Sequence, residues 1–126
     1  MRGRPRRVRI GLSALALGCL AMVAGCSASS DSTAKQACQH VERSLRLYAQ
    51  AASNPDPAAA DKERVDALVE LRTALPLASV AAANSGQWEA LRTTLSESPN
   101  VDESRLVAAL TQQCQVALAP PSARTF

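Results

Sequence analysis

Aromatic side chains are scarce in this chain of 126 residues, which contains one tryptophan, one tyrosine and one phenylalanine. Proteins that bind single-stranded nucleic acid use aromatic side chains as stacking platforms. Glycine is also rare, and Gly86 is the only one after residue 25. The sequence therefore lacks the glycine-rich loop that cradles phosphate and the Gly-x-Ser-x-Gly elbow of hydrolases. These absences argue against nucleotide binding, base stacking and serine hydrolase chemistry.

Residues that bind metals or transfer protons are few as well. No two cysteines stand two residues apart, and His40 is the only histidine, so the spacing typical of a zinc site is missing. His40 lies off the apolar stripe of its predicted helix without a carboxylate at helical spacing, and we interpret it as a solvated surface histidine. The acidic residues of 61–70 are interleaved with Lys62 and Arg64, which is typical of a solvated helix face. We expect no catalytic residue, no cofactor, no metal site and no enzymatic activity.

The net charge of +3 comes from the N-terminal end of the chain. Five of the fourteen basic residues lie within the first nine positions, and from residue 26 onward nine basic residues stand against eleven acidic ones. A nucleic-acid-binding domain carries its basic footprint on the folded part. We therefore expect no nucleic-acid partner.

The N-terminal segment has the layout of a secretory signal peptide. Its basic start is followed by an uncharged, largely apolar stretch from residue 10 to residue 26. This stretch ends in Val23-Ala24-Gly25-Cys26. The four residues resemble the lipobox of bacterial lipoproteins, in which small residues precede an obligatory cysteine.

The resemblance implies that residues 1–25 are removed and that Cys26 becomes a lipidated N-terminus, which places the chain on the extracytoplasmic side of the cell membrane. A competing box, Ala16-Leu17-Gly18-Cys19, leaves only residues 10–15 as an apolar core, so we prefer Cys26. An uncleaved signal anchor stays open, because the uncharged stretch approaches the length that spans a bilayer. Arg6-Arg7 lacks the usual twin-arginine surroundings, which favours the general secretion route.

Residues 27–33 form a polar run without apolar periodicity, which predicts a tether between the lipid and a folded domain. From residue 34 onward, apolar positions recur at intervals of three and four, the pattern of amphipathic helices. Neither a strand-like alternation nor an internal repeat is present. We therefore predict an all-α domain over residues 34–119, followed by a C-terminal tail at residues 120–126.

Prolines divide the first part of this domain. The first helix is predicted to end near Ser53, because Asn54-Pro55-Asp56-Pro57 is a dense turn signal. Asp56 followed by Pro57 predicts an N-cap and a first-turn proline for the second helix. Pro76 lacks an N–H group, so the second helix is expected to kink or restart there.

The rest of the domain is divided by glycine and proline. The second helix is expected to break at Gly86, and a third helix to end before Pro99. Asn100 and Glu103 fit a capping box for a fourth helix, which ends before Pro120-Pro121. The side chains predicted to face the core are Ala34, Ala37, Cys38, Val41, Leu45, Tyr48 and Ala52 in the first helix, Val65, Leu68, Val69 and Leu75 in the second, Trp88, Leu91 and Leu95 in the third, and Leu106, Val107, Leu110, Cys114, Ala117 and Leu118 in the fourth.

Two cysteines follow Cys26, with Cys38 near the start of the first helix and Cys114 near the end of the fourth. An isolated pair in an exported protein favours a disulfide, with two buried thiols as the alternative. An up-down-up-down bundle brings the start of its first helix beside the end of its fourth. We therefore predict a bundle of about four helices in which a Cys38–Cys114 disulfide joins the first helix to the last.

Trp88 is interpreted as a core anchor at a helix start, with a partner contact as the alternative, since tryptophan is enriched at interfaces. The whole chain resembles small helical lipoproteins of actinobacteria with no assigned function, and this resemblance transfers no activity. We expect a membrane-anchored, non-catalytic module that docks an envelope protein. The alternative is a carrier or sensor of a small apolar ligand or lipid, since the alanine-lined seams of residues 78–83 and 108–109 could either close tightly or leave a groove.

Overall fold

The computed structural model describes the backbone of residues 25–119 and the side chains of residues 30–119. Within this range the chain forms only helices and turns. The α-helices are α1 (Gly25–Ser53), α2 (Pro57–Asn84), α3 (Glu89–Glu97) and α4 (Glu103–Leu118), and the 3₁₀ turns are η1 (Gly86–Trp88) and η2 (Ser98–Asn100). The predicted all-α bundle of about four helices is confirmed.

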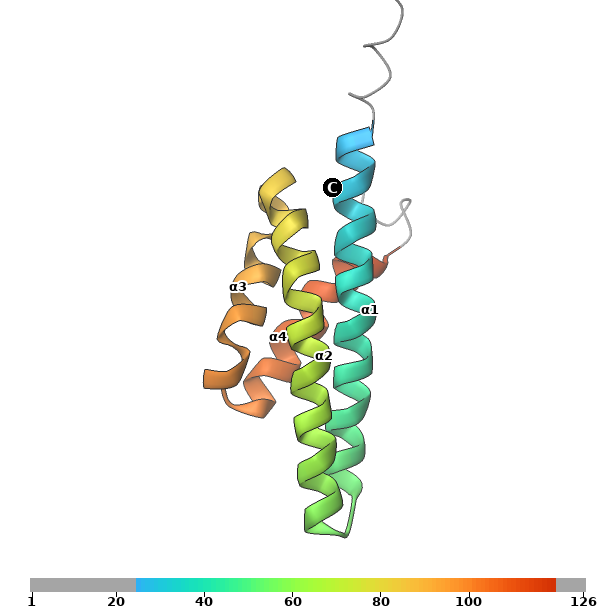
Figure 1. Ribbon diagram of the computed structural model, residues 1–126, viewed down its shortest axis with the longest axis vertical. Coiled ribbons are helices and arrows are strands. Elements are labelled where there is room, and N and C mark those ends of the chain that lie inside the picture. Colours follow the sequence, from blue (N-terminus) through green and yellow to red (C-terminus); the bar gives the residue numbers. More distant parts are fainter. Residues whose placement is uncertain (1–24, 120–126) are drawn as a thin grey trace, which may run out of the picture.

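The two long helices form a hairpin on which the two short ones pack. α1 and α2 lie side by side in opposite directions (Figure 1). α3 runs back along the C-terminal half of α2, and α4 crosses behind α2 to reach α1. The helices therefore follow the predicted up-down-up-down order. The turn between α1 and α2 projects beyond the short helices.

Local side-chain chemistry fixes the turn between α1 and α2. The Asp56 carboxylate accepts a hydrogen bond from the backbone N–H of Ala58 at 3.1 Å, and Pro57 occupies the first turn of α2, where no N–H donor is required. The Asn54 side-chain oxygen accepts from the backbone N–H of Asp56 at 3.0 Å. The predicted end of the first helix at Ser53 and the predicted cap at Asp56 are both confirmed.

Pro76 does not restart the second helix, because α2 is continuous across it. Without an N–H group, Pro76 leaves the carbonyl of Arg72 without its helical donor. Both residues lie on the exposed side of α2, so this carbonyl is not enclosed in the core. The helix ends at Asn84, and Gly86 opens η1 with no positive φ. The predicted break near Gly86 is therefore confirmed.

The segment predicted as a polar tether, residues 27–33, belongs to α1. Ser30 is buried between helices, and its hydroxyl donates to the carbonyl of Ala81 in α2 at 3.0 Å. In the sequence, a polar residue of this kind predicts a solvated tether. In the fold, its hydroxyl group can be buried because an acceptor on a neighbouring helix forms a hydrogen bond with it. The tether prediction is therefore wrong, and the helical domain begins before residue 34.

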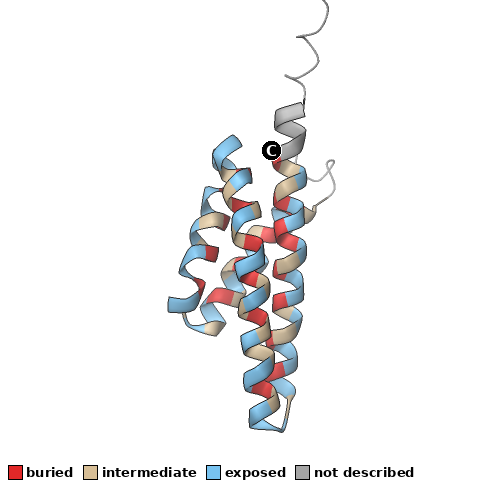
Figure 2. Cartoon of the chain, in the orientation of Figure 1, coloured by how far each residue is buried: buried red, intermediate tan, exposed pale blue. Residues whose placement is uncertain are grey.

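Alanine lines most of the contact between α1 and α2. The buried residues follow the facing sides of the two helices (Figure 2). Small side chains allow two helix axes to approach closely. We name these residues the alanine seam, and its members are Ala34, Ala37, Ala51, Ala60, Ala67, Ala74, Ala78 and Ala81.

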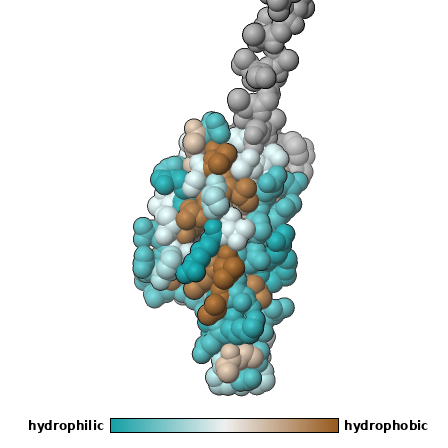
Figure 3. All heavy atoms as spheres, in the orientation of Figure 1, coloured by the Kyte–Doolittle hydropathy of each residue, from teal (hydrophilic) through white to brown (hydrophobic). Residues whose placement is uncertain are grey.

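The predicted core face of α2 is wrong for its valines. Val65 is 59% exposed and Val69 is 50% exposed. Leu71 and the members of the alanine seam that belong to α2 occupy the opposite side of this helix. The larger valines therefore point away from α1. Figure 3 shows apolar residues gathered over α2 on the face turned to the viewer. In α1, similarly, Ala51 is buried in place of the predicted Ala52.

Larger side chains fill the core around the short helices. Leu91 and Leu95 of α3 and Leu106 and Leu110 of α4 are buried, as predicted. The predicted capping box of α4 is wrong, because the N-cap is Asp102 and makes no side-chain cap. The other predicted member of the box, Glu103, accepts from Arg64 Nε of α2 at 3.1 Å.

Candidate functional site

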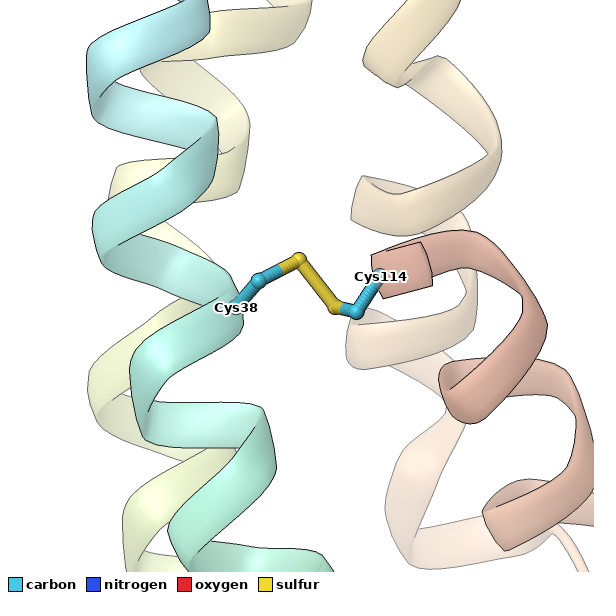
Figure 4. The surroundings of a disulfide bond; sticks show 2 residues. All are labelled: Cys38 and Cys114. Carbon is cyan, nitrogen blue, oxygen red and sulfur yellow. A yellow bond between two sulfur atoms is a disulfide. The ribbon is translucent and has the colours of Figure 1, made fainter. Parts of the chain in front are cut away.

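A disulfide joins Cys38 of α1 to Cys114 of α4, with 5.4 Å between their Cα atoms (Figure 4). The predicted bridge between the first and last helices is confirmed. Both cysteines lie in the core, at 0% and 3% exposure. Thiol–disulfide exchange requires access to a sulfur atom, so we assign this bridge a structural role.

Trp88 stands at the start of α3 and is 2% exposed. This burial agrees with its interpretation as a core anchor. Its indole Nε1 is buried without a hydrogen-bond partner among the described residues. Trp88 also lines a groove. Its alternative role, as a contact residue, would be exercised there.

This groove has a volume of about 660 Å³ and lies between α1, η1, α3 and α4. Amide and apolar side chains line it: Asp31, Gln87, Trp88, Ala90, Leu91, Gln112, Gln113 and Val116. Trp88 Nε1 and Gln113 Oε1 are both buried and unpaired within residues 30–119. The alanine-lined seams of residues 78–83 and 108–109 are not part of this groove, and Ala78 and Ala81 are fully buried, which fits the alternative of close packing.

His40 has the orienting carboxylate that the sequence pattern did not predict. Its Nδ1 lies 2.7 Å from Glu70 Oε2, and Arg43 lies 3.7 Å from the same oxygen. The His40 side chain is only 23% exposed, so its interpretation as a solvated surface residue is wrong. Glu70 belongs to α2 and lies thirty positions after His40 in the chain. The spacing of residues within α1 could therefore not predict this pair.

The His40–Glu70 pair lies apart from the groove, since neither residue is among the groove's lining residues. Within residues 30–119, the hydrogen bonds of His40 go to Glu70 and Arg43. Neither of these partners supplies the hydroxyl or thiol of a Ser–His or Cys–His pair. In the described part of the chain, no three His, Cys, Asp or Glu residues come together in a way that could hold a metal ion.

The acidic residues near the start of α2 pair with bases at the surface. Lys62 Nζ lies 2.7 Å from Asp66 Oδ2, and Arg64 Nη1 lies 3.2 Å from Asp61 Oδ1. All four side chains are more than two-fifths exposed. Exposed pairs of this kind contribute little free energy. The prediction of a solvated face holds for Asp61 and Asp66, whereas Glu63 and Glu70 are half-buried.

A row of exposed apolar residues runs along the outer side of α2. Val65, Val69 and Val80 are 59%, 50% and 52% exposed. Their spacings of four and eleven residues are close to whole helical turns, and Arg72 and Pro76 fall in the same row. We call these five residues the α2 stripe. Within residues 30–119, the other exposed large hydrophobic residue is Val116 of α4.

Cys26, the predicted lipidation site, lies in the first turn of α1. Its side chain and residues 1–24, which include Cys19 and most of the lipobox, lie outside the described part of the chain. Lipidation of Cys26 therefore stays a prediction.

Comparison of the chain with models of known protein families, with curated proteins and with solved structures finds no match. Function is therefore inferred from the chain's own residues.

Across residues 25–119, no helix is long and apolar enough to cross a lipid bilayer.

Proposed function

We propose that this chain is an exported lipoprotein held to the cell membrane through lipid on Cys26, and that its helical domain docks another envelope protein without catalysing a reaction. The α2 stripe carries this proposal. Its three valines are at least half exposed, on a side of α2 that faces away from the other described helices. Extended apolar surface on a folded domain marks an interaction site.

The start of α1 supports the anchoring role. α1 is helical from Gly25, so Cys26 lies on a helix that continues into the core. A helix rises about 1.5 Å per residue, which places Cys26 about 18 Å along the axis from Cys38. Lipid on Cys26 would hold the start of α1 at the membrane and leave the α1–α2 turn at the far end of the domain.

The arrangement of polar side chains supports a non-catalytic role. A general base acts only within hydrogen-bond reach of a substrate proton. His40 and Glu70 are bonded to each other outside the groove, while the groove is lined by amides and apolar residues around Asp31. The site with space for a molecule and the pair with acid–base character are therefore in different places.

Metabolic labelling with a fatty-acid analogue tests the anchor. Cys26→Ala should abolish labelling and release the chain from the membrane fraction, because the sulfur atom of Cys26 is the proposed attachment point of the lipid. Cys19→Ala is the matched control and should keep both properties. The reverse result would move the anchor to Cys19, and membrane retention without labelling of either variant would indicate an uncleaved signal anchor.

Photo-crosslinking in the native envelope tests the docking role. A photoreactive residue is placed in turn at exposed positions of all four helices in the full-length chain. A docking module should yield an adduct with a second envelope protein from one face. The absence of an adduct at every position would contradict the proposal.

A carrier of a small apolar ligand or lipid is the second candidate function, and the groove favours it. A volume of about 660 Å³ lies in the range of small-molecule sites. Native mass spectrometry of the protein from its own host separates the two candidates. A carrier should retain a small molecule, and Ala90→Trp, at an exposed position of the groove lining, should displace it by filling the groove.

A further inference from the structure

We infer that the α2 stripe binds an amphipathic helix of another exported protein, and that this helix carries an Asp or Glu which pairs with Arg72. The inference rests on the proposed docking role and names the surface and the chemistry of the partner. It follows from the shape of the stripe, its one charge and the position of the anchor.

The stripe has the dimensions of a helix-packing surface. Its positions 65, 69, 72, 76 and 80 follow steps of four, three, four and four, so they form one row along α2. The same steps describe the seam through which one helix packs on another. From Val65 to Val80 the row extends over about 22 Å, and an amphipathic partner helix of about four turns would cover it.

Arg72 gives this row a charge without a partner. The other basic side chains of α2, Lys62 and Arg64, each have a carboxylate within 3.2 Å. Arg72 has no ion pair or hydrogen bond to a side chain in residues 30–119. A guanidinium that becomes surrounded by apolar contacts is stabilised by a carboxylate, which can accept two parallel hydrogen bonds.

Pro76 adds a second polar feature at the same level. The carbonyl of Arg72 lacks its helical donor because Pro76 has no N–H group. A partner helix therefore meets a cation and a free acceptor in the middle of an otherwise apolar row. A serine, threonine or lysine beside the carboxylate of the partner would satisfy this acceptor.

A second copy of the chain fits the stripe poorly. With both lipid anchors in one membrane, a two-fold axis makes the two α2 helices parallel and sets Arg72 against Arg72, which is repulsive. The antiparallel arrangement relieves this repulsion, but it moves the two Cys26 residues apart by about the length of α1. At 29 residues this length is about 43 Å, so the two anchors could not share one membrane.

A lipid surface also fits the stripe poorly. A helix that lies on an anionic membrane carries Lys and Arg along its polar flanks. Acidic residues outnumber basic ones on α2, which gives the helix a net negative charge. The acidic residues are Asp61, Glu63, Asp66 and Glu70, and the basic residues are Lys62, Arg64 and Arg72.

Crosslinking from single positions of the full-length, anchored chain tests the inference. A photoreactive residue at position 69 should give an adduct with one other protein. Position 116 of α4 is the matched control, because Val116 is 49% exposed and Val69 is 50% exposed. Peptide mapping of the adduct should locate the crosslink in a helix that carries Asp or Glu within one turn of the linked residue.

Charge reversal tests the pairing with Arg72. Arg72→Glu should lower the adduct yield from position 69 about tenfold, because two carboxylates would then face each other, and Arg72→Lys should retain most of the yield. Replacing the mapped carboxylate of the partner by Lys should restore the adduct in Arg72→Glu. Far-ultraviolet circular dichroism and an intact disulfide would show that the variants are folded.

Several outcomes would overturn the inference. An adduct with a second copy, or with lipid alone, would replace the partner helix by that occupant. Equal adduct yields from positions 69 and 116 would reject the α2 stripe as the binding surface. An unchanged yield in Arg72→Glu would reject the ion pair. An adduct from another face, with none from position 69, would leave the docking role standing and reject this surface.

Discussion

The two sides of the bundle are held together by different kinds of side chain. Between α1 and α2 the buried residues are mostly those of the alanine seam. Around α3 and α4 they are tryptophan and leucine, namely Trp88, Leu91, Leu95, Leu106 and Leu110. One side thus gains its packing from the length and closeness of two helices, and the other from the size of a few residues.

This difference predicts opposite sensitivities to mutation. A tightly packed alanine leaves no space for added volume, so enlargement should be costly there. A fully buried leucine contributes about 1.5–3 kcal/mol from burial, and its removal leaves a cavity. We therefore expect the α1–α2 side to be most sensitive to larger residues and the α3–α4 side to smaller ones.

Separating the two sides should have the largest effect. Reduction, or replacement of Cys38 and Cys114 by serine, should lower the free energy of unfolding by about 4.5 kcal/mol, because the bridge closes a loop between residues 76 positions apart. Denaturant titration of the oxidised and reduced domain measures this change. Cys26→Ala is the control and should leave the oxidised domain unchanged. Two alkylatable thiols in the native, unreduced protein would contradict the bridge itself.

Truncation on the α3–α4 side should rank next. Leu110→Ala should lower the free energy of unfolding by about 3 kcal/mol, since Leu110 is fully buried. Thermal and denaturant unfolding would measure the loss. Val80→Ala on the exposed face of α2 is the control, with an expected change below about 0.5 kcal/mol. Equal losses in the two variants would show that the large-residue core is loosely packed.

Enlargement on the α1–α2 side should follow. Ala74→Leu should lower the free energy of unfolding by about 2 kcal/mol, because Ala74 is fully buried against the facing helix. Ala83→Leu, at an exposed position of the same helix, provides the control and should be nearly neutral. If Ala74→Leu instead raised stability, the alanine seam would hold unfilled space, and the contrast between the two sides would fail.

The smallest effect should appear at high pH. Burial raises the pKa of Tyr48 above its ordinary value of 10.0, and the charge of Glu103 raises it further. The folded-state pKa exceeds the unfolded one, so the contribution of Tyr48 to stability is complete below about pH 10 and is lost as pH rises through the folded-state value. Tyr48→Phe should remove this part of the alkaline loss.

Tyr48 is the sole tyrosine, so its ionisation can be followed directly by the absorbance of tyrosinate. Unfolding free energies of the two proteins should agree near neutral pH and diverge in alkali, with Tyr48→Phe the more stable. Parallel loss in both proteins would assign the alkaline sensitivity to other groups.

Much of the fold was predictable because the signals that begin and end its helices are local in sequence. The cap at Asp56, the end of α1 at Ser53 and the break near Gly86 depend on residues within a few positions of each other. The disulfide followed from the pairing of two remaining cysteines with the order of the helices. Such features require no knowledge of which face of a helix meets its neighbour.

The features that the sequence did not predict depend on contacts between helices. Val65 and Val69 are more hydrophobic than Ala67 and Ala74, yet the alanines are buried, because close approach of α1 selects size over hydrophobicity. The pairing of His40 with Glu70 spans two helices in the same way. The α2 stripe, as a candidate site, was hidden by this error, since its valines had been assigned to the core.

The short turn at Asn54–Asp56 also bears on how the domain is made. A three-residue connection closes the hairpin of the two long helices at a small loop-closure cost, and helical folds of this kind form within microseconds to milliseconds. Oxidation of two thiols takes seconds to hours. The chain should therefore reach its shape well before it acquires its bridge, with Cys38 and Cys114 already held side by side. The supply of oxidant, and not the search for the fold, should set the pace at which the domain matures.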